Sequence, residues 1–77
     1  MSKSIIELMR ADKWNTEATI GPYLEAIRIA KLIDAGGSIK ELGPQYYAAC
    51  GTIPATEHRR RFMGYGLDAM GLQVEAS

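Results

Sequence analysis

Residues 22–35, PYLEAIRIAKLIDA, decide the fold of this chain. Their apolar residues recur every three or four positions and fill a wide arc of a helical wheel, while Glu25, Arg28 and Lys31 lie on the opposite side. Pro22 suits the first helical position, where its missing N–H would have no partner in any case. We therefore predict a central core helix over this stretch.

Turn signals follow the core helix directly. The pair Gly36-Gly37 supplies the left-handed conformation that the C-terminus of a helix favours. Ser38 and Glu41 have the spacing of a capping box, in which each side chain satisfies a free backbone N–H of the other residue. A further helical turn is expected to begin there.

The pair Gly43-Pro44 interrupts this next segment. Proline removes a helical hydrogen bond and disfavours α geometry in the residue before it. We therefore predict a short turn over 38–42 and a separate helix over 44–50, with Gly51 ending it.

The two ends of the chain are predicted to be helical as well. Ser4 and Glu7 form a second capping box, and the helix they start should fade near Trp14. Pro54 suits the first position of a last helix. The apolar face of that helix is formed by Phe62, Met63, Leu67 and Met70. Glycine costs roughly 1 kcal/mol against alanine inside a helix, so Gly64, Gly66 and Gly71 weaken its second half.

Length and composition agree with one small all-α domain. The chain has 77 residues, 47% of them hydrophobic and 23% charged, which leaves room for a single core. We predict a compact bundle of four or five short helices over 1–77, with 73–77 as an extended or disordered tail. A core this small supplies about 3–5 kcal/mol, so we expect a homodimer.

Few residues offer chemistry. The chain has one Cys and one His, Cys50 and His58, too few for a zinc site, and their spacing is no signal of a nucleophilic pair. The fragment Gly64-Tyr65-Gly66 lacks the strand and the glycine spacing of a dinucleotide loop. We expect no catalytic residue, no metal, no cofactor and no enzymatic activity. The lone cysteine and the absence of a signal peptide or membrane segment favour the cytoplasm.

The charge of the chain is balanced overall and polarised locally. Nine Lys and Arg offset nine Asp and Glu. Residues 1–57 carry −1, residues 58–67 carry +3 and residues 68–77 carry −2. The positive segment contains His58-Arg59-Arg60-Arg61, and the wheel places Arg60 and Arg61 away from the apolar face. A solvated helix face would explain these arginines, and so would contacts to a nucleic acid.

The order of segments from Ile27 to Glu75 resembles the helix-turn-helix DNA-binding domains of small bacterial and phage regulators. It comprises a helix, Gly-Gly, a short helix, Gly51, Pro54-Ala55-Thr56 and the basic run. The resemblance implies a regulator of transcription that binds duplex DNA. It also implies that the DNA contacts come from Thr56, His58, Arg59, Arg60 and Arg61, with Ser38 or Lys40 on a phosphate.

A protein-binding module is the alternative from another functional class. Tyr, Met and Arg are enriched at protein interfaces, and the C-terminal half of this chain is rich in them. The interface residues predicted on this basis are Tyr46, Tyr47, Tyr65 and Met70. The core should absorb at least half of the aromatic and methionine residues in this half. A phage-type protein that inhibits or modulates a host enzyme, such as a polymerase, would have this composition.

Overall fold

Four helices and no strand make up the regular structure of the described residues. The computed structural model describes residues 4–17 and 20–70, with the backbone alone at Met70. The helices are α1 (Ile5–Ala11), α2 (Pro22–Asp34), α3 (Ile39–Gly51) and α4 (Thr56–Met70). The prediction of an all-α bundle is confirmed. The tail predicted at 73–77 lies outside the described residues.

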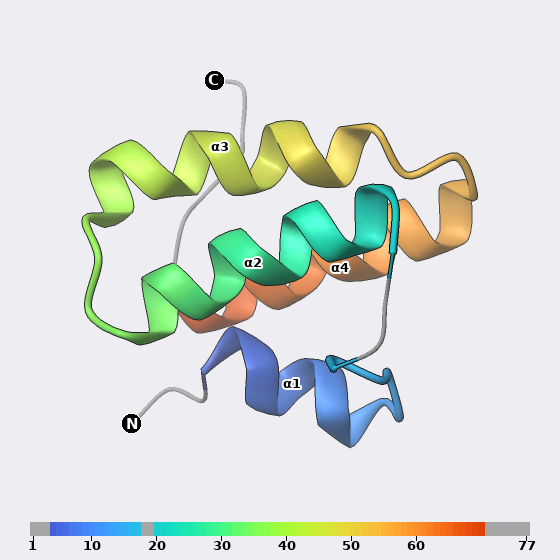
Figure 1. Ribbon diagram of the computed structural model, residues 1–77, viewed down its shortest axis with the longest axis horizontal. Helices are drawn as coiled ribbons and strands as arrows, with labels where there is room; N and C mark the ends of the chain where they lie inside the picture. Colours follow the sequence, from blue (N-terminus) through green and yellow to red (C-terminus); the bar gives the residue numbers. More distant parts are fainter. Residues whose placement is uncertain (1–3, 18–19, 71–77) are drawn as a thin grey trace.

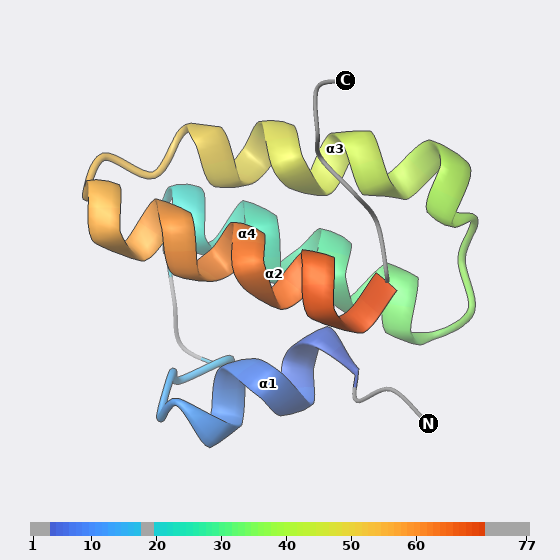
Figure 2. The same cartoon turned by 180° about the vertical axis from the view of Figure 1, so that it is seen from behind.

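The helices pack as three roughly aligned rods with a short fourth helix across one side (Figure 1). α2 and α3 run in opposite directions as a hairpin, and α4 returns alongside α3 on the far side of α2. Seen from behind, α4 covers α2 and α1 lies below both (Figure 2). α1 packs against α2 and α4, whereas α3 packs against the same two helices from the other side.

Helix α1 is fixed by two sets of caps. The predicted capping box is confirmed, because Ser4 Oγ accepts from the Glu7 N–H at 3.0 Å and Glu7 Oε1 accepts from the Ser4 N–H at 3.2 Å. Asp34, at the end of α2, adds a tertiary cap: its two carboxylate oxygens accept from the N–H groups of Ile5 and Ile6, each at 3.0 Å. These bonds satisfy free N–H groups of the first turn and join α1 to α2.

The α2–α3 hairpin follows the predicted turn signals. Pro22 occupies the first turn of α2, as expected. Gly36 has a φ of +101°, a left-handed conformation that other residues rarely adopt. Ser38 Oγ accepts from the Glu41 N–H at 3.3 Å and starts α3. The core helix therefore ends, and the next begins, within a residue or two of the expected positions.

The predicted break at Gly43-Pro44 is wrong. α3 continues through Pro44, which lies exposed inside the helix. Buried residues lie on both sides of the proline: Gly43 before it, and Tyr46, Ala49 and Cys50 after it. We attribute the continuity to this packing, because burying one continuous helix face offsets the single hydrogen bond that proline removes.

The last helix begins two residues later than predicted. Pro54 lies in the turn between α3 and α4, and α4 starts at Thr56. Ile53 is fully buried, so this turn is anchored in the core. The carbonyl oxygen of Ile53 accepts from Arg59 Nε at 3.0 Å. The Arg59 side chain therefore satisfies the carbonyl of Ile53. In a helix that started at Pro54, this carbonyl would have accepted a backbone N–H of the first turn instead.

The core draws on all four helices. Tyr46 and Phe62 are the largest fully buried side chains, and the Tyr46 hydroxyl donates to the carbonyl of Phe62 at 2.6 Å, which joins α3 to α4. The isoleucines of the core are Ile5, Ile6, Ile27, Ile29, Ile33 and Ile53. Cys50 is buried in the same core.

The α3–turn–α4 segment is an antiparallel hairpin. Both views show the two helices side by side and running in opposite directions (Figures 1 and 2). In DNA-binding helix-turn-helix motifs the two helices cross at about 90–120°. The order of elements is thus the one that suggested the resemblance, while the arrangement of α3 and α4 differs from that motif.

Candidate functional site

The basic run His58-Arg59-Arg60-Arg61 lies in the first half of α4, and much of it is held by other parts of the chain. The Tyr23 hydroxyl and His58 Nδ1 are 2.9 Å apart in a partly buried hydrogen bond. The His58 ring also meets the Trp14 ring edge to face, with centroids 5.0 Å apart. These contacts join His58 of α4 to α2 and to the loop after α1. The ring is held against these two segments and is not presented to a ligand.

Arg59 also has a structural role. Its Nε donates to the carbonyl of Ile53 at 3.0 Å, and its terminal NH2 group donates to the carbonyl of Pro54 at 3.5 Å. The side chain is half-buried against the turn that precedes α4. The predicted role of Arg59 in DNA contact would require these bonds to break.

Arg60 and Arg61 face solvent, as the helical wheel predicted. Arg60 is exposed and has no hydrogen-bond or ion-pair partner among the described residues. Arg61 pairs with Asp12 at 3.6 Å, and its side chain remains 53% exposed. Thr56 is exposed at the start of the same helix. The predicted DNA contacts thus reduce to Arg60, Arg61 and Thr56.

Lys40 does not join these arginines. It lies in the first turn of α3, whereas Arg59, Arg60 and Arg61 lie in the first half of α4. Those two helix starts are at opposite ends of the bundle (Figure 1). The two predicted phosphate-binding regions are therefore separated by the length of α3.

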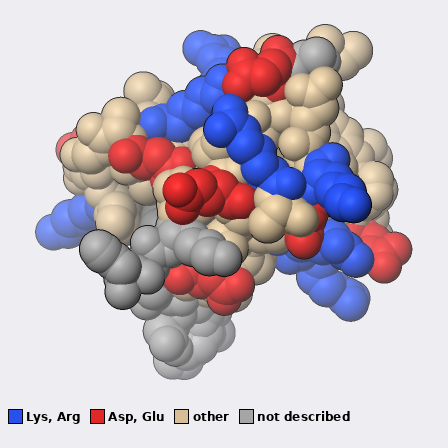
Figure 3. Space-filling view, turned by 90° about the horizontal axis from the view of Figure 1, so that it is seen from below, with Lys and Arg blue, Asp and Glu red and all other residues tan. Residues whose placement is uncertain are grey.

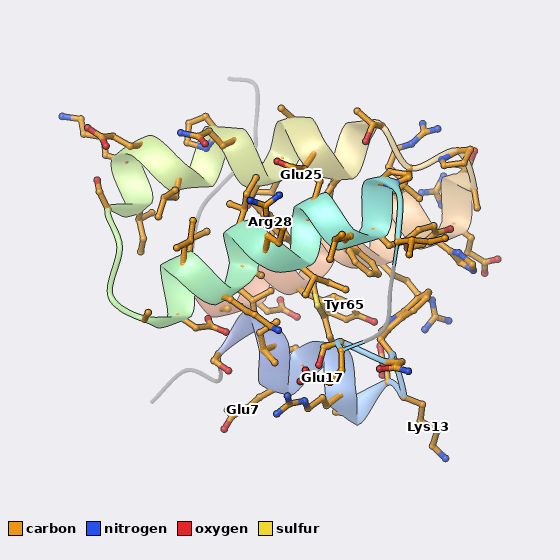
Figure 4. All side chains as sticks on the ribbon, viewed as in Figure 1. Glu7, Lys13, Glu17, Glu25, Arg28 and Tyr65 are labelled. Atoms are coloured by element: carbon orange, nitrogen blue, oxygen red, sulfur yellow. The ribbon has the colours of Figure 1, made fainter. Side chains whose placement is uncertain are left out.

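Acidic side chains break up the basic ones on the surface. From below, Lys and Arg alternate with Asp and Glu, with no broad field of one sign (Figure 3). Among the ion pairs of the described residues, Glu17 pairs with Arg10 at 2.9 Å and with Lys31 at 3.9 Å. Lys13, whose φ is +69°, points away from the bundle beside them (Figure 4).

Two of the tyrosines predicted at a protein interface are in the core. Tyr46 is fully buried and Tyr65 is 7% exposed, so the prediction that they lie on an exposed binding surface is wrong. Their rings fill space between helices, and their hydroxyls are used in internal hydrogen bonds. Tyr47 is half-buried, and its hydroxyl is enclosed without a hydrogen-bond partner among the described residues. The side chain of Met70 lies outside the described part of the chain.

Large apolar side chains are exposed elsewhere. They are Ile20, Leu24, Leu32 and Ile39, with exposed fractions of 78%, 39%, 55% and 41%. Leu24 and Leu32 belong to α2, four residues before and four residues after Arg28. At 3.6 residues per turn the three side chains lie within a sector of about 80°.

We call Leu24, Glu25, Arg28 and Leu32 the α2 outer face. Glu25 and Arg28 form an ion pair at 3.6 Å and lie together on α2 (Figure 4). Ile27, Ile29 and Ile33 point the other way, into the core. This face was not predicted from the sequence, although the helical wheel that placed Arg28 opposite the core also places both leucines on the Arg28 side.

The buried titratable groups are neutral at physiological pH. Burial raises the pKa of the Cys50 thiol to about 11 and raises the pKa of Tyr46 well above its usual value. For Tyr65, burial and then the hydrogen bond to Asp12 raise the pKa of the hydroxyl. A thiol with so high a pKa is a poor nucleophile, because the thiolate is the reactive form.

The described residues form no metal cluster, no pocket and no membrane-spanning helix. In residues 4–17 and 20–70, no cluster of three His, Cys, Asp or Glu side chains is arranged to hold a metal ion, and no pocket is present. None of the helices in these ranges is both long and apolar enough to cross a membrane. Comparison with known proteins is equally negative, because no family model, curated protein or solved structure matches the chain.

Proposed function

We propose that this chain is a protein-interaction module that docks through the α2 outer face. The observation that carries the proposal is the exposure of Leu24 and Leu32 on one side of α2, opposite the side that forms the core. A helix that covers the core on one side normally presents polar residues on the other. α2 instead presents apolar surface in two directions.

The mixture of groups on this face is suited to recognition of a protein. Two leucines provide apolar area, and the exposed guanidinium of Arg28 between them provides hydrogen-bond donors. Arginine is enriched at interfaces, and an apolar centre with charged groups at its edge is their common design. The activity that we propose for the chain is binding to another protein, for example a host enzyme.

Affinity capture with matched variants tests this proposal. The tagged chain is used as bait in extracts of the cells that produce it, and each captured protein is identified, purified and bound again in isolation. We expect Leu24→Ser/Leu32→Ser to lose at least 10-fold in affinity for that purified partner, because each lost leucine contact contributes about 1 kcal/mol or more.

Ile39→Ser is the matched control for the capture experiment. Ile39 is exposed to the same extent as Leu24 but belongs to α3, outside the proposed face. The control should bind like the wild type. Equal binding by the wild type and the double variant would contradict the proposal, as would the absence of any partner, a second copy of this chain included, that binds again after purification.

DNA binding is a second candidate, supported by one observation. Arg60 is exposed on the first half of α4, without a partner among the described residues, next to the exposed Arg61. Two exposed arginines at one end of a helix suit phosphate contacts better than base readout, which needs an element that enters a groove. In this form the protein would regulate transcription through DNA-backbone contacts.

A salt titration distinguishes the DNA candidate from protein binding. Binding of a labelled duplex is measured by fluorescence anisotropy at several salt concentrations. If both arginines contact phosphates, Arg60→Ala/Arg61→Ala should flatten the log–log salt slope by about 0.9 per lost contact. Arg28→Ala removes one exposed positive charge on α2 and is the control. No salt-dependent binding, or equal slopes in all variants, would contradict DNA binding.

A further inference from the structure

The α2 outer face has a symmetry that suits pairing with itself. Leu24 and Leu32 are equally distant from Arg28 along the helix, four residues on either side. A two-fold axis through the middle of such a face brings each leucine of one chain to the other leucine of the second chain. Interfaces between identical subunits related by a two-fold axis need this kind of self-complementary surface.

We propose that the α2 outer face binds the α2 outer face of a second copy of this chain, with the two-fold axis close to Arg28. This inference rests on the proposed function, because it names the occupant of the same docking surface. The two helices pack face to face, and Leu24 of one chain contacts Leu32 of the partner subunit.

The spacing of the residues also fixes how the two helices cross. Leu24, Arg28 and Leu32 are separated by four residues and form one i±4 ridge of the helix surface. When i±4 ridges of two helices fit into each other's grooves, the helices cross at about −50°, the commonest class in globular proteins. That crossing turns the two ridges parallel to each other, so that both leucine contacts form at once.

Charge complementarity identifies a second copy as the occupant. Arg28 and Glu25 are 69% and 56% exposed, and they are linked by a single 3.6 Å ion pair, so both side chains can adjust. At a two-fold axis through Arg28, each arginine lies between its own Glu25 and Glu25 of the partner subunit. Two arginines and two glutamates then form one neutral cluster between the two leucine contacts.

The remaining charge near this face does not disturb the cluster. Lys31 lies on the flank of α2, and its Nζ is 3.9 Å from Glu17, a residue of the segment that precedes α2. Both partners of that ion pair stay partly exposed, Lys31 at 48% and Glu17 at 67%. The facing surface of each chain therefore carries Arg28 and Glu25, while Lys31 beside them is paired with Glu17.

Sedimentation equilibrium of the purified full chain tests the pairing. A contact through one helix lies at the lower end of interface sizes, so we expect association over about 10 µM to about 1 mM. The weight-average mass of the wild type should rise over this range from 8.4 kDa toward twice that value. Leu24→Ser/Leu32→Ser should remain monomeric, whereas Ile39→Ser should associate like the wild type. Circular dichroism of every variant checks that the helices are intact.

Charge exchange provides the decisive comparison. Arg28→Glu places four carboxylates at the two-fold axis and Glu25→Arg places four guanidinium groups there, so each single variant should associate at least 10-fold more weakly. The double variant Glu25→Arg/Arg28→Glu should recover the wild-type mass. A change in the stability of α2 alone would not restore the dimer mass in the double variant. The measured quantity is association, and it depends on charges that face each other across the two chains.

The outcomes separate this inference from the proposed function. A wild type that stays at 8.4 kDa up to 1 mM overturns the pairing, as does a dimer that persists in Leu24→Ser/Leu32→Ser or a double exchange that fails to associate. A monomeric chain whose purified partner is lost only in the leucine variant contradicts the pairing and leaves the docking surface in place. A monomer whose partner is retained by the leucine variant contradicts both.

Discussion

The Nε1–H of Trp14 donates to the hydroxyl of Tyr65 at 2.7 Å, across 51 positions of the sequence. The same hydroxyl donates to Asp12 Oδ2 at 2.5 Å, and Arg61 pairs with that same carboxylate oxygen at 3.6 Å. Tyr65 lies between α4 and α1 (Figure 4). One hydroxyl thus fastens the segment after α1 to α4, which explains how a helix of seven residues keeps its place in the bundle.

Tyr65→Phe should destabilise the protein by about 1–3 kcal/mol. The substitution keeps the ring in the core and removes the hydroxyl, so Trp14 loses its acceptor and Asp12 loses a donor in a partly buried setting. Leaving such groups unpaired costs more than the bond itself contributes. Urea unfolding followed by the fluorescence of Trp14, the single tryptophan, measures the change.

Tyr47→Phe is the matched control for this prediction. The Tyr47 hydroxyl is enclosed and has no hydrogen-bond partner in the part of the chain that the structure describes. Its removal should leave the stability unchanged or raise it, because an unsatisfied buried hydroxyl is unfavourable. Equal losses in the two variants would show that the ring environment, and not the hydrogen-bond relay, determines the effect.

Asp34→Ala should loosen α1 selectively. The carboxylate accepts two N–H bonds at the start of α1, and removing a capping acceptor costs about 1–2 kcal/mol. Hydrogen–deuterium exchange should show faster exchange in α1 than in α3. Asp68→Ala is the control, because Asp68 is exposed on α4 and has no partner within the described residues. Unchanged exchange in α1 would contradict the capping role.

Local signals in the sequence predicted much of this fold. Ser4, Pro22, Gly36 and Ser38 act through their own turn, so helix ends marked by them were predicted within a few residues. The failure at Pro44 has a different origin. Whether a proline breaks a helix depends on what the residues around it bury, and that is decided by α2 and α4, which lie far away in the sequence.

The candidate site was harder to predict for the same reason. A helical wheel separates the exposed Arg60 from the core, but it cannot show that Arg59 bends back to the carbonyl of Ile53 or that His58 meets Tyr23. Those contacts depend on the turn before α4 and on the position of α2. Leu24 and Leu32 did not need the structure, since their spacing already places them beside Arg28.

Gly64→Ala and Gly37→Ala should change stability in opposite directions. A Cβ at Gly64 meets nothing within 4 Å, so alanine adds helix propensity and should stabilise α4 by about 1 kcal/mol. A Cβ at Gly37 would lie 2.9 Å from the backbone oxygen of Leu32, which cannot move away cheaply, and 2.4 Å from Leu42 Cδ1. That variant should lose stability. Shifts of the same sign in urea midpoints would contradict this account.

Stability should fall as the pH rises above about 9, and Cys50 should account for part of the loss. A raised pKa means that the folded chain holds a proton which the unfolded chain releases, so the contribution is complete below pH 9.0 and disappears as the pH passes through about 11. Two pH units correspond to about 2–3 kcal/mol for this fully buried thiol.

Urea unfolding at pH 7.5, 9, 10 and 11 measures the slope for the wild type and for Cys50→Ala. The variant lacks the thiol and should show a shallower fall between pH 9 and 11. Its remaining slope should come from the tyrosines, whose pKa values burial also raises, Tyr46 most of all. Identical slopes would mean that the thiol is not protected from ionisation by the fold.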